Sequence, residues 1–91
     1  MPNLRKEAKG RECQVRSPVC NGNPETVVLA HLNGAGMGRK HDDALGAWCC
    51  GACHTWLDGG YAKTHSKDER DLYHLWGMAR TVEALRGEGK L

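Results

Sequence analysis

The chain has 91 residues, a formal net charge of +2 and no phenylalanine. A chain of this length forms at most one domain with a thin hydrophobic core, so we expect a single domain over residues 1–91, stabilised by something besides apolar packing. The cysteines number five, and the first ten residues include no apolar stretch; this argues against a closed disulfide framework, a secretion signal and a membrane span. We therefore expect a cytoplasmic protein whose clustered cysteines bind a metal ion.

The first ten residues, 1–10, are predicted to form a short helical or flexible arm. Basic side chains gather in this arm and just after it, at Arg5, Lys6, Lys9, Arg11 and Arg16. A basic segment of this kind can bind the phosphates of a nucleic acid. The alternative is a solvated terminus that binds nothing.

Residues 11–60 are predicted to contain a knuckle and two strands. The segment from Cys13 to Cys20 runs directly into the turn-forming sequence NGNP, which indicates a tight knuckle. The β-branched and apolar run at 25–32 predicts one strand, and the apolar run at 44–50 predicts a second strand antiparallel to the first.

The segment between the strands, residues 33–43, is rich in glycine and includes Arg39 and Lys40. Because it has no periodicity, we expect a surface loop that can close on a ligand. A short helix is predicted at 52–57, ended by two consecutive glycines.

A long C-terminal helix is predicted at 66–87. Ser66 can cap its first turn, which also carries Asp68 and Glu69. Apolar side chains recur at intervals of three and four residues, at Leu72, Leu75, Trp76, Ala79, Val82 and Leu85. Gly77 interrupts the helix at a cost of about 1 kcal/mol relative to alanine, which indicates close packing or a slight bend.

This helix leaves the oligomeric state open. It can pack entirely on its own domain, or it can leave Tyr73, Trp76 and Met78 on a face that pairs with a second copy. We slightly prefer a monomer over a homodimer.

Two pairs of cysteines predict a structural zinc site. Cys50 and Cys53 have the two-residue spacing with which one turn presents two sulfurs to one ion, and Cys13 and Cys20 form a second pair at a looser spacing. Bound Zn2+ would stabilise a thin core. Cys49 is expected to face the packed side, since adjacent residues of an extended chain point in opposite directions. The alternative is that these cysteines are small buried apolar residues.

A second cation site is predicted directly after the cysteines. His54 and Asp58 are four residues apart, so both side chains lie on one face of the predicted helix and can bind a divalent ion. His31 ends the first predicted strand and is the expected general base, because a histidine with a pKa of about 6.5 can take a proton from an attacking water. The alternatives are a strand-end histidine bonded to a carbonyl, a turn aspartate, and His54 as a structural ligand.

Several motifs in combination resemble a known class of nucleases. The patterns A-H-L at 30–32 and C-x2-C-H-x2-L-D-x-G at 50–60 resemble the HNH or His-Me finger nucleases. More narrowly, RECQVRSPVCNGNPETVVLAH at 11–31, G-Y-A-K at 60–63 and G-M-A-R-T at 77–81 resemble the YbcO family of phage and prophage proteins, over nearly the whole chain.

The resemblance implies an α+β fold, in which a small ββα-metal domain is stapled by a treble-clef-like zinc site and followed by the long helix. His31 and His54 would be the catalytic residues. His54 and Asp58 would bind the catalytic Mg2+ or another divalent cation, and the two cysteine pairs would bind Zn2+. Two departures stand out: Ala30 replaces a common metal ligand, and the usual loop asparagine has no clear counterpart.

The implied activity is a metal-dependent DNA endonuclease that hydrolyses phosphodiester bonds with little sequence specificity. The short helix would enter the minor groove, and the DNA backbone would be held by Arg5, Arg11, Arg16, Arg39 and Lys40. The alternative is a non-catalytic, zinc-stabilised module that binds nucleic acid or another protein. Phage or host recombination or repair proteins stay open as partners.

Overall fold

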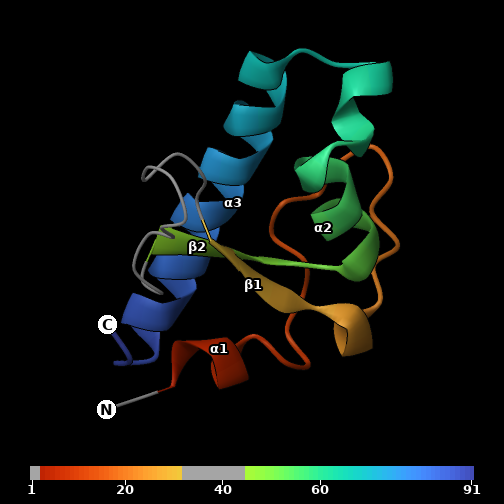
Figure 1. Cartoon of the computed structure of the whole chain (residues 1–91). Helices are drawn as coiled ribbons and strands as arrows, with labels where there is room; N and C mark the ends of the chain where they lie inside the picture. Colours follow the sequence, from red (N-terminus) through yellow and green to blue (C-terminus); the bar gives the residue numbers. More distant parts are fainter. Residues whose placement is uncertain (1–2, 32–44) are drawn as a thin grey trace.

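The computed structural model describes residues 3–31 and 45–91, and it places helices around a small central sheet (Figure 1). This arrangement confirms the α+β class predicted from the sequence. The predicted loop at 33–43, with Arg39 and Lys40, lies outside the described residues.

The sheet has two antiparallel strands, as predicted. Strand β1, Val28–His31, pairs with strand β2, Gly46–Cys49, and the register places Ala30 opposite Ala47. All four residues of β2 are buried, whereas β1 alternates in exposure and ends at a half-buried His31. The sheet therefore presents the end of β1 at the edge of the core.

Both strands are shorter than predicted because polar caps interrupt them. Residues Pro24–Thr26 form a 3-10 turn, η1, which delays the strand predicted at 25–32. Asn23 caps this turn by accepting a hydrogen bond from the backbone N–H of Glu25, and proline at the first position suits a helical turn because its φ is fixed. On the other strand, Cys50 leaves the ladder to cap the next helix.

Helix α2, Gly51–Asp58, confirms the predicted short helix and extends it by one residue at each end. Cys50 caps its first turn, where its sulfur accepts a hydrogen bond from the backbone N–H of Cys53. Trp56 lies on the buried side of α2, and its ring meets three others edge to face, with centroids 5.1 to 6.1 Å away. These rings belong to His65, Tyr73 and Tyr61, the last within a second 3-10 turn, η3, Gly60–Lys63.

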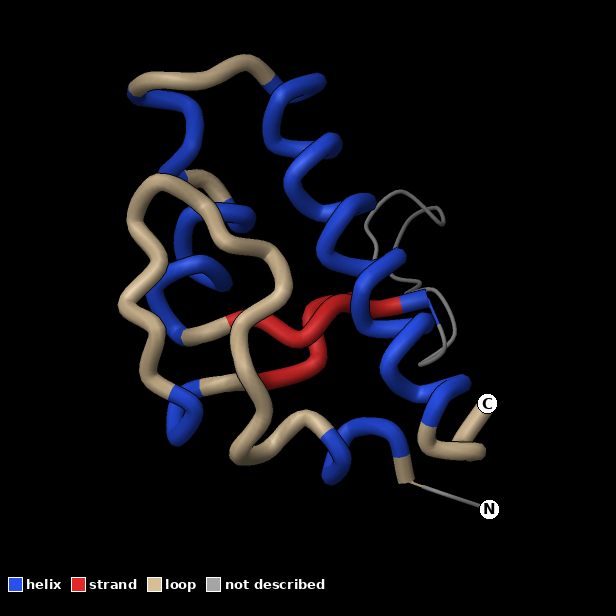
Figure 2. Tube along the Cα trace, turned by 180° about the vertical axis from the view of Figure 1, so that it is seen from behind, coloured by secondary structure: helices blue, strands red, loops and turns tan. Residues whose placement is uncertain are grey.

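The predicted N-terminal arm contains a one-turn helix, α1, Leu4–Glu7, capped by the side chain of Asn3. In Figures 1 and 2 this helix lies at the same end of the molecule as the C-terminus. Helix α1 and the C-terminal residues are therefore neighbours.

The long helix α3, Lys67–Gly87, confirms the C-terminal helix predicted at 66–87. Ser66 and Glu69 form a capping box, in which each side chain accepts a hydrogen bond from the backbone N–H of the other. Of the helices in the described ranges, none has the apolar length needed to cross a bilayer.

The face that α3 turns to the core is more polar than its apolar periodicity suggests. Its buried residues are Arg70, His74, Gly77, Thr81 and Leu85, whereas Leu72, Leu75 and Trp76 are exposed. The polar side chains are satisfied by backbone groups: the Thr81 hydroxyl accepts from the N–H of Trp48, and Arg70 donates to the carbonyl of Leu57. Helix α3 is therefore fastened to the sheet by hydrogen bonds as well as by packing.

Gly77 is the point of closest approach between α3 and the knuckle. A Cβ atom placed there would lie 2.9 Å from Cγ2 and 3.0 Å from Cα of Val15. Hydrogen bonds hold this contact closed, since Arg80 donates to the carbonyl of Gln14, whose N–H in turn donates to the carbonyl of Trp48. Figure 2 shows the knuckle as the long tan loop with α2 on one side and α3 on the other.

We expect Gly77→Ala to destabilise the fold, because the added methyl group overlaps rigid backbone atoms of Val15. Overpacking of this kind costs roughly 1–3 kcal/mol, and the better helix propensity of alanine offsets only part of it. Chemical denaturation of both proteins measures the difference. Gly87→Ala is the matched control, since its Cβ atom would meet nothing within 4 Å; equal losses in the two variants would contradict the close-approach argument.

Candidate metal centre and active-site pocket

Four cysteines converge where the knuckle meets α2. Their sulfur atoms all lie within 4.8 Å of one another, and no disulfide joins any of them. A tetrahedral Zn2+ ion with bonds of about 2.3 Å needs sulfurs about 3.8 Å apart. The Cys13–Cys53 and Cys20–Cys50 sulfur pairs are 3.6 and 3.8 Å apart, so this thiol cluster can hold a metal ion such as zinc.

The cluster holds protons that a cation would displace. The hydrogen bond shared with Cys53 lowers the pKa of Cys13 to about 4, and the same bond raises the pKa of Cys53 above its usual value. Cys53 also lies 3.1 Å from the buried hydroxyl of Ser17. Because crowded thiols resist forming neighbouring thiolates, positive charge at the centre of the cluster would be strongly favoured.

Cys49 stands apart from the cluster, on the packed side where it was expected. Its side chain is fully buried, and burial raises the pKa of its thiol to about 12. It behaves as a small apolar core residue.

We expect one zinc ion per chain and the loss of that zinc in Cys53→Ser. The variant removes one of four ligands, so both the zinc content and the melting temperature should fall. Elemental analysis and thermal unfolding measure the two effects. Cys49→Ala is the control, since it removes a buried thiol outside the cluster; retention of a full zinc complement in Cys53→Ser would contradict the assignment.

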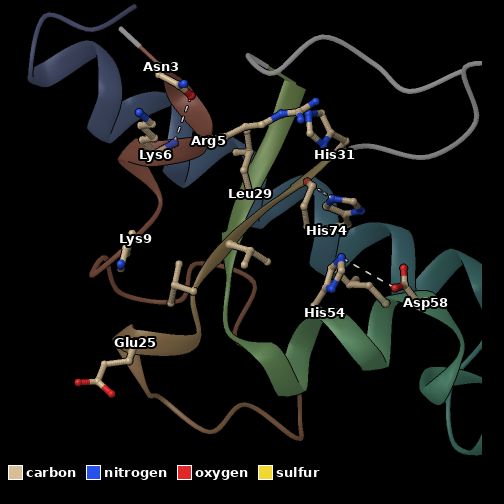
Figure 3. A pocket seen from close by; sticks show the side chains of 14 residues that line it. Asn3, Arg5, Lys6, Lys9, Glu25, Leu29, His31, His54, Asp58 and His74 are labelled. Atoms are coloured by element: carbon tan, nitrogen blue, oxygen red, sulfur yellow. Dashed lines mark hydrogen bonds and ion pairs between the residues drawn. The ribbon is translucent and has the colours of Figure 1, made fainter.

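A pocket of about 920 Å³ opens between α1, β1, α2 and α3 (Figure 3). The predicted base and catalytic-metal ligands line it, and they come from separate elements: His31 ends β1, while His54 and Asp58 project from α2. The predicted general base and both predicted ligands of the catalytic cation therefore line one pocket.

His54 and Asp58 lie on adjacent turns of α2 and point the same way (Figure 3). Nε2 of His54 is 3.8 Å from Oδ2 of Asp58, and the side chains are 47% and 61% exposed. A nitrogen and a carboxylate oxygen at this separation, open to solvent, can bind one divalent ion and leave coordination positions for water or a phosphate oxygen.

His74 of α3 is a pocket residue that the sequence did not indicate. It is 2% exposed, and its Nε2 donates a hydrogen bond of 3.0 Å to the carbonyl of Ala30, next to His31. Burial lowers the pKa of His74, which favours the neutral form of its ring. Its spacing from Arg70, Gly77 and Thr81 does mark one face of the helix, but the apolar repeat on another face is the stronger signal.

The predicted phosphate-binding residues separate into different places. Arg5 lines the pocket, together with the neighbouring cations Lys6 and Lys9. Arg11 and Arg16 do not line it.

Arg11 forms ion pairs with carboxylates near both ends of the described chain. It binds Glu7 and Glu88, and Lys90 binds the same two carboxylates. The hydrogen bonds from Arg11 and Lys90 lower the pKa of Glu88 to about 2. This network ties α1 to the residues that follow α3.

A family model described as "Putative nuclease YbcO" matches residues 2–90. The chain belongs to the YbcO family. Two curated members are each 48% identical over 100 aligned residues, covering 98% of this chain and 96% of the relative; they come from Escherichia coli strain K12 and Enterobacteria phage 82.

A solved structure supports the same relationship. It is described as a "putative bacteriophage protein" from Escherichia coli K-12 MG1655, and it matches with a TM-score of 0.79 and 44% sequence identity. The match covers 96% of this chain and 100% of that chain. This chain therefore shares its fold and nearly its full length with that protein.

We expect His74 to make stability depend on pH. Burial lowers its folded-state pKa below the ordinary histidine value of 6.5, so the unfolded chain binds the proton more readily. Stability from this residue is complete above about pH 6.5 and is lost as the pH falls towards the lower folded-state pKa. His74→Gln keeps a donor for Ala30 without titrating, so its unfolding free energy should fall less on acidification; parallel pH profiles for the two proteins would disprove this.

Proposed function

We propose that this chain is a metal-dependent DNA endonuclease of the HNH or His-Me finger class, with little sequence specificity. The observation that carries the proposal is that His31, His54 and Asp58 line one pocket, and that α2, which carries two of them, also carries Cys53 of the four-thiol cluster. The names of the YbcO relatives support a nuclease activity.

The order of the elements supports the same class. Strands β1 and β2 are followed at once by α2, which is the chain order of a ββα-metal unit. The thiol cluster joins the knuckle to the first turn of α2, as expected for a treble-clef-like zinc site. The zinc ion would fix the helix from which the proposed catalytic side chains project.

In the proposed mechanism, His54 and Asp58 would hold Mg2+ or another divalent cation. Such an ion supplies a Lewis acid that polarises the scissile phosphate and stabilises the leaving oxygen. His31, at the end of β1, would take a proton from the attacking water. The hydrogen bond from His74 to Ala30 holds the backbone next to that base, so His74 would act as a positioning residue.

The basic edge of the pocket would bind the DNA backbone. Arg5, Lys6 and Lys9 line the pocket from α1 and the turn after it, where they can contact phosphates on either side of the cleaved bond. Figure 3 shows Arg5 extended towards the end of β1 that carries His31. Arg39 and Lys40 stay predictions for the same role.

The second candidate is a zinc-stabilised module that binds without catalysis. Ala30 favours it, because this residue stands where many enzymes of the class have a metal ligand. Ala30 belongs to β1, and its side chain is buried. Only two described side chains, His54 and Asp58, would then hold the catalytic ion.

Plasmid nicking with Mg2+, Mn2+ or Ni2+ tests the proposal. We expect His31→Ala to lower the rate by about 10² to 10⁴-fold, the usual contribution of a general base, and His54→Ala to abolish metal-dependent cleavage. Thr55→Ala, an exposed neighbour on α2, is the control and should cleave as the wild type does.

Two results would decide against this assignment. Equal nicking by the wild type and His31→Ala would remove the proposed base. One zinc per chain, with no second divalent site by titration and no cleavage with any of the three metals, would favour the binding module.

A further inference from the structure

The outer side of α3 carries a stripe of six residues with heptad spacing. Successive members are separated by four, three, four, three and four residues: Asp68, Leu72, Leu75, Ala79, Val82 and Arg86. This alternation is the a/d pattern with which one helix packs against another. The stripe, which we call the seam, is apolar in the middle and oppositely charged at its two ends.

Within residues 3–31 and 45–91, the fold leaves most of the seam uncovered. Leu72 is 57% exposed and Leu75 is 41% exposed, and Trp76, at the edge of the seam, is 62% exposed. The residues that α3 buries, among them His74 and Thr81, lie on its other side. At 3.6 residues per turn, His74 and Ala79 are about 140° apart around the helix. A three-turn apolar surface on α3 therefore faces solvent.

We propose that a second copy of this chain packs antiparallel on the seam, with the twofold axis passing between the two helices at the level of residue 77. In that register Asp68 of one copy lies opposite Arg86 of the other, Leu72 opposite Val82, and Leu75 opposite Ala79. Each layer then joins either opposite charges or two apolar side chains, and large side chains alternate with small ones. The arrangement is isologous, so every contact forms twice.

Charge decides the direction of the two helices. A parallel pair in register would stack Asp68 on Asp68 and Arg86 on Arg86, which places like charges together at both ends. The antiparallel pair replaces both repulsions with attractions. Trp76 lies beside the axis, so the two exposed indole rings cover each other's apolar surface.

The proposed dimer leaves the pocket open. His74 reaches the pocket from the opposite side of α3, so a partner on the seam does not cover it. The contact is also short, because one stripe of six residues belongs at the small end of specific interfaces. A weak dimer that forms with rising concentration is expected.

A nucleic acid is a less suitable occupant of this surface. Arg16 and Arg80 flank Trp76 in a small groove and could suit a stacked base, but both arginines already bind Gln14. Asp68 would also repel a phosphate backbone at one end of the seam. Sedimentation detects a second copy, whereas a loss of DNA affinity in a seam variant would detect a nucleic acid.

Sedimentation equilibrium of the zinc-loaded full chain tests the proposal. We expect the mean mass to rise from 10.0 kDa towards twice that value as the concentration increases, and Leu75→Glu to weaken dimerisation at least tenfold. Val19→Glu is the matched control, because Val19 is equally exposed but lies on the knuckle, and it should dimerise as the wild type does. A wild type that stays monomeric at every concentration would overturn the proposal. If the wild type is monomeric and Leu75→Glu loses affinity for DNA, the surface binds nucleic acid and not a second copy.

Charge reversal tests the direction of packing. Asp68→Arg and Arg86→Asp should each weaken the dimer, because each creates like-charged end layers, and the double variant should restore it. Circular dichroism checks folding, since Asp68 lies in the first turn of α3. A dimer unaffected by the single changes, or not restored by the double change, would rule out the antiparallel register.

Discussion

The rest of the structure depends on the convergence of four thiols between the knuckle and α2. The sheet has two short strands, too few to be stable alone, and the core offers few large apolar side chains. Cys50 directly follows β2, caps α2 and contributes a sulfur to the cluster, so this one residue connects the sheet, the helix and the thiols. An ion bound there would fix the direction in which α2 leaves the sheet, and the direction of α2 sets where His54 and Asp58 point.

The attachment of α3 shows how a thin core is extended with polar groups. Thr81, His74 and Arg70 each reach a backbone partner in or near the sheet, and Gly77 lets Val15 approach closely. Hydrogen bonds of this kind contribute modestly each but are costly to break once buried. Because polar residues fill the inner side of α3, its large apolar residues lie on the outer side, where they can pack against a partner but not against the core.

Much of this could be predicted from local patterns. The cysteine pairs, the two strands and the capped long helix each have a short-range signal, and the spacing of His54 and Asp58 placed them on one face of α2. The inward face of α3 could not be predicted, because its apolar repeat marks the exposed side and the buried His74 depends on a carbonyl 44 residues away. The ion pair of Arg11 could not be predicted either, because its partner Glu88 comes from the other end of the chain.

The ion-pair network at the chain ends has a consequence for the pocket. Glu88 and Lys90 form ion pairs with Arg11 and Glu7. Glu7 belongs to the one-turn helix α1, which also carries Arg5 and Lys6. So short a helix has little stability of its own. Proteolytic trimming just before Glu88 would therefore let α1 fray. A cut remote from the pocket would weaken the proposed binding of a polyanion by Arg5 and Lys6 and leave the thiol cluster untouched.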